Sequence, residues 1–74
     1  MEAKRVGRRI KSYRKLKRYT QQQFADQLHI SVGLLSAVER GAKEAPDELL
    51  QKIVATLQID KQELIDADGH DDKG

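Results

Sequence analysis

The stretch from Thr20 to Gly41, TQQQFADQLHISVGLLSAVERG, predicts two short helices joined by a tight turn. Thr20 is a good N-cap, and Gln23 three residues later completes the pattern of a capping box. Ser31 is suited to cap the second helix, and Gly41 is suited to the position that follows its last turn. These signals bound both helices.

Apolar residues within this stretch have the spacing of one face in each helix. They are Phe24, Ala25 and Leu28 in the first helix, and Leu35 and Val38 in the second. Two helices separated by a turn of about three or four residues match the helix-turn-helix motif. His29, in the turn, has no second ligand at helical spacing, so we interpret it as a turn residue rather than a metal ligand.

The flanking residues predict three further helices and no strands. A helix from about 5 to 17 carries the apolar stripe Val6, Ile10 and Tyr13, and Tyr19 is expected to turn into the core. Pro46 suits the first position of a fourth helix. The stripe of that helix, which is expected to end at about Leu57, is Leu50, Ile53, Val54 and Leu57. Asp60 and Glu63 form a cap signature before a short fifth helix that contains Leu64 and Ile65.

Length and composition predict one small domain. Residues 1–65 are expected to form it, and residues 66–74, which lack periodicity, are expected to be an acidic flexible tail. The 74 residues include no cysteine, which fits a cytoplasmic location. No apolar run approaches the roughly 18 residues of a membrane span, and the charged start is no signal peptide.

Charge is distributed unevenly along the chain, although its net value is only +2. Residues 1–19 hold nine basic residues against one acid, whereas residues 44–74 hold nine acids against three basic residues. Such a basic end suggests an anionic partner, and phosphate attraction is favoured over a membrane surface; a solvated helix face, which is what most runs of charge are, is the alternative. A membrane-surface helix is disfavoured because the stripe of three apolar residues is too thin for insertion.

The span from about Val6 to Ile65 resembles the phage-repressor (Cro-type, or XRE) helix-turn-helix family, a compact five-helix all-α domain. The residues that carry the resemblance are Ile10 and Arg14, T-Q-Q-Q-F-A at 20–25, Leu28, Ile30-Ser31, Leu35-Ser36, Glu39-Arg40-Gly41, Pro46, Leu50, Ile53, Leu57 and Ile59. The resemblance implies that the helix from about 32 to 40 lies in the major groove of double-stranded DNA. It further implies base-facing positions at Val32, Gly33, Leu34, Ser36 and Ala37.

Phosphate contacts are implied for a second group of residues, namely Lys17, Arg18, Gln21, Ser31, Arg40 and Lys43. Gln21 alternatively serves as a simple first-turn helix residue, and Ser31 is first of all an N-cap. In related domains an arginine and a glutamate at the places of Arg14 and Glu39 form a partly buried structural ion pair. Relatives usually have glycine where Arg18 and His29 stand, so the first helix is expected to end differently here. The turn at His29 is expected to survive.

The base-facing positions hold no Arg, Lys, Asn or Gln, which are the side chains that read guanine or adenine through paired hydrogen bonds. A serine hydroxyl and apolar contacts to thymine methyl groups remain. Val32 and Leu34 alternatively form an exposed apolar patch for a protein partner, or are scattered surface residues. The expectation is nonetheless DNA binding.

The sequence is therefore interpreted as a cytoplasmic DNA-binding transcriptional regulator, with a repressor favoured, acting as a homodimer associated with a bacterial or phage nucleoid. Helix five, with Leu64 and Ile65, is a suggested pairing surface. The alternative is a protein-binding adaptor or antirepressor that uses Val32 and Leu34. An enzyme is disfavoured because no catalytic set or phosphate-binding loop can be assembled, and no cofactor or metal is expected.

Overall fold

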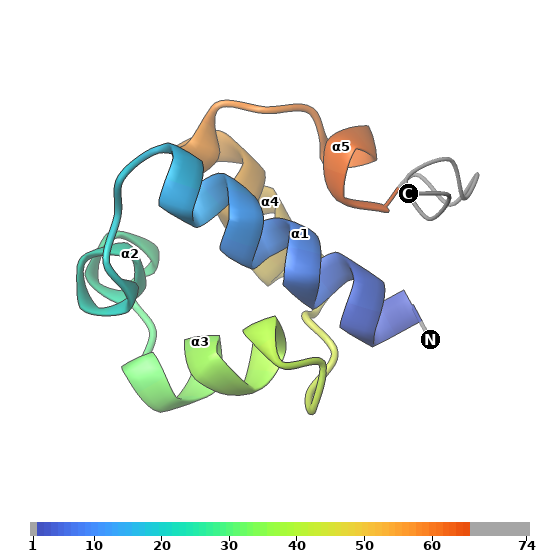
Figure 1. Cartoon of the computed structure of the whole chain (residues 1–74), viewed down its shortest axis with the longest axis horizontal. Helices are drawn as coiled ribbons and strands as arrows, with labels where there is room; N and C mark the ends of the chain where they lie inside the picture. The colour runs from blue at the N-terminus through green and yellow to red at the C-terminus, as the bar shows by residue number, and fades with distance from the viewer. Residues whose placement is uncertain (1, 66–74) are drawn as a thin grey trace.

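A computed structural model describes residues 2–65 of the chain and contains five α-helices over that range (Figure 1). Their bounds are α1 Glu2–Leu16, α2 Gln21–Leu28, α3 Val32–Glu39, α4 Asp47–Leu57 and α5 Lys61–Ile65. The predicted all-α fold is confirmed, and none of the helices within residues 2–65 is long and apolar enough to cross a membrane. The expected acidic tail at 66–74 lies outside the described residues.

The helix-turn-helix motif is formed by α2 and α3, and it begins with the predicted capping box. The Thr20 hydroxyl accepts a hydrogen bond from the Gln23 backbone N–H at 3.0 Å, and the Gln23 side chain accepts one from the Thr20 N–H at 3.0 Å. Ser31 caps α3, where its hydroxyl accepts a hydrogen bond from the Leu34 N–H at 3.1 Å. Both helix starts are therefore fixed by local chemistry.

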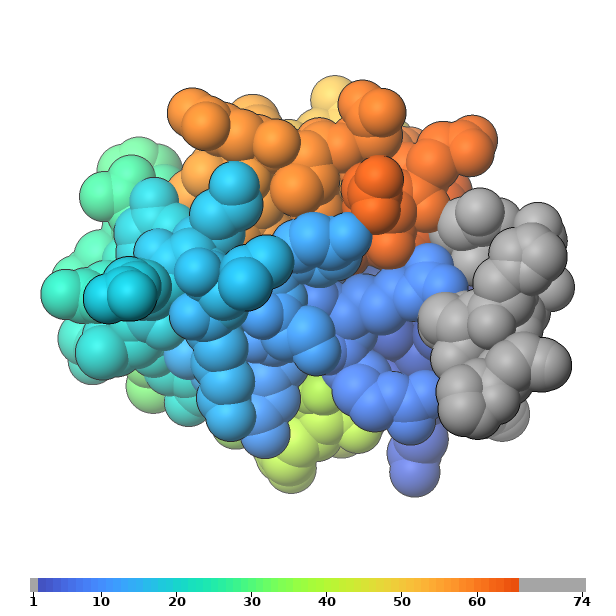
Figure 2. Space-filling model, turned by 45° about the horizontal axis from the view of Figure 1, so that its top comes forward, coloured from blue at the N-terminus to red at the C-terminus, as the bar shows by residue number. Residues whose placement is uncertain are grey.

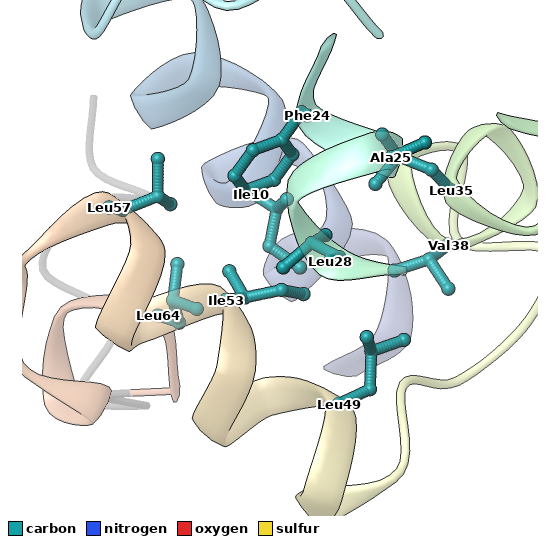
Figure 3. Packing of buried hydrophobic residues seen from close by; sticks show 10 residues of the cluster. All are labelled: Ile10, Phe24, Ala25, Leu28, Leu35, Val38, Leu49, Ile53, Leu57 and Leu64. Atoms are coloured by element: carbon teal, nitrogen blue, oxygen red, sulfur yellow. The ribbon is translucent and has the colours of Figure 1, made fainter. Parts of the chain in front are cut away.

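The hydrophobic core lies where α1, the motif and α4 converge, and α5 closes one side (Figures 1 and 3). The buried residues drawn in Figure 3 are Ile10, Phe24, Ala25, Leu28, Leu35, Val38, Leu49, Ile53, Leu57 and Leu64. The half-buried Tyr19 packs against this cluster, and its ring centre lies 5.3 Å from that of Phe24. The core thus draws on every helix of the described region.

Helix α4 differs from its prediction in two respects. Pro46, with ψ at 158°, occupies the N-cap rather than the first helical position, and Asp47 begins the helix. The buried face starts at Leu49 rather than Leu50, which is half-buried together with Val54. The two consecutive leucines lie about 100° apart on a helix, so either one could begin an apolar stripe.

Helix α1 begins about three residues earlier than predicted, and it ends in a way that the sequence argument did not expect. Arg18 adopts a left-handed conformation with φ at 67°, as a glycine would at this position. The backbone N–H groups of Arg18 and Tyr19 donate to the carbonyls of Lys15 and Arg14, a Schellman motif. The expectation that α1 ends differently is therefore wrong.

The same kind of ending recurs after α2 and α3. His29 has φ at 60°, so the predicted survival of the turn is confirmed. Gly41 follows α3 with φ at 77°, and its N–H donates to the Val38 carbonyl. A Cβ atom on Gly41 would also lie 2.6 Å from the Lys4 Cα, so glycine is required here by space as well as by conformation.

Candidate nucleic-acid interface

The outward face of α3 is built from small residues. Gly33 is exposed, while Ser36 and Ala37 are half-buried. These residues lie on the side of α3 opposite Leu35 and Val38, which are enclosed in the core. Because their side chains are short, the α3 backbone can approach a flat or grooved ligand closely.

Val32 and Leu34, the apolar members of the expected base-facing group, are not freely exposed. Both are half-buried and pack against the hydrophobic core. Within residues 2–65 the large apolar side chain that does remain exposed is Leu16, at 69%, and it lies at the end of α1. The possibility of an exposed apolar patch at Val32 and Leu34 is therefore not supported by their burial.

Arg14 and Glu39 form the expected ion pair between α1 and α3. The guanidinium donates from Nε to one Glu39 carboxylate oxygen at 2.7 Å and from Nη2 to the other at 3.2 Å. The two side chains are 8% and 2% exposed, so the pair lies almost entirely out of water. Arg14 also donates to the Tyr19 carbonyl at 2.8 Å, which ties the pair to the turn between α1 and α2.

Gln21 joins this network from the first turn of α2. Its side-chain amide donates to Glu39 Oε1 at 3.0 Å, a structural hydrogen bond that the sequence did not predict. An amide group carries a second N–H, which remains for another acceptor. The Glu39 carboxylate thus fixes the orientation of the Gln21 side chain.

The other residues expected at phosphates all lie on the surface. Lys17 and Arg18 are exposed between α1 and α2, and Arg40 and Lys43 are exposed after α3. Ser31 is exposed too, and its hydroxyl is already engaged in capping α3. Exposed cations therefore precede α2 and follow α3.

One feature of the site was not predicted from the sequence. Gly7 lies directly against α3, because a Cβ atom there would meet the carbonyl oxygens of Val38 at 2.2 Å and Glu39 at 2.7 Å. A glycine within the expected first helix, one turn before Ile10, was the available signal for this close contact.

Leu64 of α5 is fully buried, so it is not available to a partner and the suggestion that this residue pairs two copies is wrong.

Metal binding has no support in the described part of the chain. Within residues 2–65 no group of three or more His, Cys, Asp or Glu residues is placed to hold a metal ion. His29 is exposed at the end of α2, where its backbone conformation forms the turn.

A sequence model of the helix-turn-helix family matches residues 10–64. The chain belongs to the helix-turn-helix family. The matched residues include the whole α2–α3 motif, the second half of α1, all of α4 and nearly all of α5. The resemblance to XRE-type domains is thereby confirmed.

Several curated relatives of this helix-turn-helix protein are known from Bacillus subtilis. The HTH-type transcriptional regulator YazB is 45% identical over 64 residues, which cover 86% of this chain and 93% of YazB. SlrR is 41% identical over 85% of this chain and 42% of SlrR, and SinR is 34% identical over 82% of this chain and 56% of SinR. The chain therefore spans nearly all of YazB but only about half of the two larger regulators.

Solved structures of other helix-turn-helix proteins have the same arrangement of helices. The clp gene regulator ClgR of Corynebacterium glutamicum superposes with a TM-score of 0.82 at 30% identity, covering 86% of this chain and 83% of that one. The restriction-modification controller protein C.AhdI of Aeromonas hydrophila superposes with a TM-score of 0.79 at 24% identity, covering 84% and 94%. The latter likeness shows the fold alone. The family is one of transcriptional regulators, and this helix-turn-helix protein is not an enzyme.

Proposed function

We propose that this protein is a DNA-binding transcriptional repressor that acts in the cytoplasm as a homodimer. The observation that carries the proposal is the outward face of α3, built from Gly33, Ser36 and Ala37 and followed directly by exposed cations. In helix-turn-helix proteins the second helix of the motif enters the major groove. Repression would follow from occupation of a promoter by the bound dimer.

Base reading by α3 would rest on few polar groups. The Ser36 hydroxyl can accept or donate a hydrogen bond, and the Ala37 methyl group can contact the methyl group of thymine. Val32 and Leu34 would add apolar contact at the edges of this face, limited by their burial. We therefore expect thymine-rich sites and modest discrimination between sequences.

Phosphate contacts would supply most of the affinity. The backbone N–H groups at the start of α2 and the second amide N–H of Gln21 would bind one phosphate, with Lys17 and Arg18 beside them. Arg40 and Lys43 would bind phosphates beyond the other end of α3. Since Glu39 holds Gln21 through a 3.0 Å hydrogen bond, the phosphate contact and the recognition helix would be positioned together.

An NMR titration with an AT-rich duplex at two salt concentrations tests the proposal. We expect amide shifts concentrated at residues 31–37, at Gln21 and at Arg40 and Lys43, and we expect them to weaken at the higher salt concentration. The amides of α5 serve as the internal control and should move least. Shifts absent from residues 31–37 would refute the major-groove assignment and favour an adaptor that binds another protein.

The homodimer is tested separately, by sedimentation with DNA. Pairing on a two-fold operator requires half-sites about one helical turn, or 10 base pairs, apart. We expect two copies to bind cooperatively to a duplex with that spacing once an operator has been selected. Independent binding of single copies at every spacing would contradict the dimer while leaving DNA binding intact.

A further inference from the structure

Four basic residues of α1 lie on one side of the helix. Lys4, Arg8, Lys11 and Lys15 are separated by four, three and four residues, which places them in a single stripe. All four are exposed, and none of them forms a hydrogen bond or ion pair with another residue in the range 2–65. We call this group the α1 stripe.

Other basic residues of α1 are used within the fold. Arg9 donates from Nη1 to the α5 carbonyls of Glu63 at 3.1 Å and Leu64 at 3.3 Å. Arg14 is buried against Glu39. Arg5 is half-buried, and it too is engaged in an interaction. The helix therefore separates cations that hold the fold together from the four that remain available.

The N-terminal end of the α1 stripe lies beside the C-terminal end of α3. Gly7 contacts the C-terminal end of α3, and Lys4 packs against Gly41 just after that end. Ile10, which enters the core, is rotated about 60° from Gly7 in one direction, whereas the stripe is rotated about 40–100° in the other. The stripe consequently faces outward on the side of α3 that points away from the core. Figure 2 shows α1, in blue, with the yellow-green end of α3 along its lower edge.

The stripe also connects the two groups of cations at which phosphate contacts were proposed. Its first member, Lys4, lies beside Gly41 and hence next to Arg40, and its last member, Lys15, precedes Lys17 and Arg18. Eleven residues of helix rise about 16 Å. Measured along the axis of a duplex, that length corresponds to about five nucleotides of one strand, at about 3.4 Å of axis per nucleotide.

A stripe of this kind weakens the free protein. Like charges three or four residues apart on a helix repel each other, and the stripe contains three such pairs in a row. Glu2 is the sole acid within α1, so no acid is interspersed to relieve the repulsion. A helix face that is merely solvated does not require this arrangement, whereas binding to a row of phosphates does.

We propose that Lys4, Arg8, Lys11 and Lys15 bind consecutive phosphates of one DNA strand that borders the groove occupied by α3. This inference rests on the proposed function, because it assumes that the protein binds duplex DNA. A membrane surface is a poorer ligand, since the apolar side of α1 is packed into the core and has nothing to insert.

The salt dependence of DNA affinity tests the inference. Wild-type protein and the variant Arg8→Gln/Lys11→Gln would be titrated with a mixed-sequence 20-base-pair duplex at several salt concentrations. Each lost phosphate contact makes the slope of log Kobs against log salt less negative by about 0.9, so we expect a change of about 1.8. Affinity at 0.1 M salt should fall roughly tenfold or more. Lys61→Gln, on α5, is the control. Removal of this single charge should leave the slope nearly unchanged.

The outcomes separate the inference from the function on which it rests. Suppose that the wild type binds the duplex with a steep slope, and that the double variant changes this slope no more per charge removed than Lys61→Gln does. The proposed role of the α1 stripe is then refuted and DNA binding stands. If the wild type does not bind any duplex, both fail. A thermal melt by circular dichroism checks folding, and the double variant should melt no lower than the wild type because the repulsion within the stripe is relieved.

Discussion

Helix α1 contacts α3 and α5 in different ways. Against α3 it presents Gly7, whose position allows the two backbones to touch, and the Arg14–Glu39 ion pair, which is almost fully buried. Against α5 it presents two polar side chains at the surface. Arg9 donates to α5 carbonyls, and the Tyr13 hydroxyl donates to the Glu63 carboxylate at 2.7 Å.

The difference shows which contact fixes the candidate recognition helix. Charges held away from water interact strongly and are costly to leave unpaired, whereas hydrogen bonds at the surface compete with water and contribute little net stability. The α1–α3 contact should therefore set the position of α3 within narrow limits. The α1–α5 contact should be replaceable at small cost.

The largest expected effect comes from Glu39→Ala. Removal of this carboxylate leaves the buried Arg14 guanidinium without its partner and frees the Gln21 amide. The loss of one member of a buried pair costs about 3–5 kcal/mol, which is comparable with the total stability of a small domain. We expect the thermal unfolding midpoint to fall by more than about 12 °C, measured by circular dichroism.

Glu44→Ala is the matched control for that substitution. Glu44 is exposed in the loop before α4, so its removal should change the free energy of unfolding by no more than about 0.5 kcal/mol. Equal melts for the two variants would show that the Arg14–Glu39 pair contributes no more than a surface charge.

The second largest effect is expected from Gly7→Ala. Alanine normally favours a helix interior by about 1 kcal/mol over glycine, but here the added methyl group would meet two α3 carbonyl oxygens. Because backbone cannot rotate away as a side chain can, we expect a net loss of about 2–3 kcal/mol, measured by urea denaturation. Ser12→Ala, at an exposed position of the same helix, should instead be neutral or slightly stabilising.

Local signals explain most of what the sequence predicted correctly. The capping box at Thr20, the cap at Ser31 and the glycine at Gly41 act within a few residues, and each is present as expected. The buried faces of α2 and α3 follow from apolar spacing alone. The ion pair of Arg14 with Glu39 required the family resemblance, because 25 residues separate its members.

What the sequence did not reveal depends on how helices pack. The reason for Gly7 appears only when α3 lies against α1, and spacing cannot choose between Leu49 and Leu50. The conformational preference of arginine alone does not favour a left-handed conformation at Arg18. In the structure the turn is held by backbone hydrogen bonds and by Arg14, which donates to the Tyr19 carbonyl.

Arg18→Gly measures the cost of this left-handed conformation. The expected effect is smaller than that of Gly7→Ala and opposite in sign. A non-glycine residue with φ at 67° is strained by about 1–2 kcal/mol, part of which is offset because glycine gains more entropy in the unfolded chain. We expect a net stabilisation of roughly 0.5 kcal/mol in urea denaturation. A destabilised variant would mean that the Arg18 side chain contributes more than its conformation costs.

Tyr13→Phe should also have a small effect, because it alters only the surface contact with α5. The hydroxyl donates to the Glu63 carboxylate, and this bond, followed by desolvation, raises the pKa of Tyr13 above its ordinary value of 10.0. Since the folded pKa is the higher one, the contribution to stability is complete below pH 10 and is lost as the pH rises through the folded value. At pH 7 we expect a loss below about 1 kcal/mol.

Melting curves of the wild type and Tyr13→Phe between pH 8 and pH 11 check both parts of this prediction. Subtraction of the variant's midpoint from that of the wild type at each pH removes the effects of all other groups that titrate in this range, including the lysines. The difference between the midpoints should be small at pH 8 and should shrink toward zero above pH 10, where the phenol loses the proton that it donates. A difference that stays constant with pH would assign the effect to ring packing rather than to the hydrogen bond. A loss as large as that of Gly7→Ala would overturn the contrast between the two sides of α1.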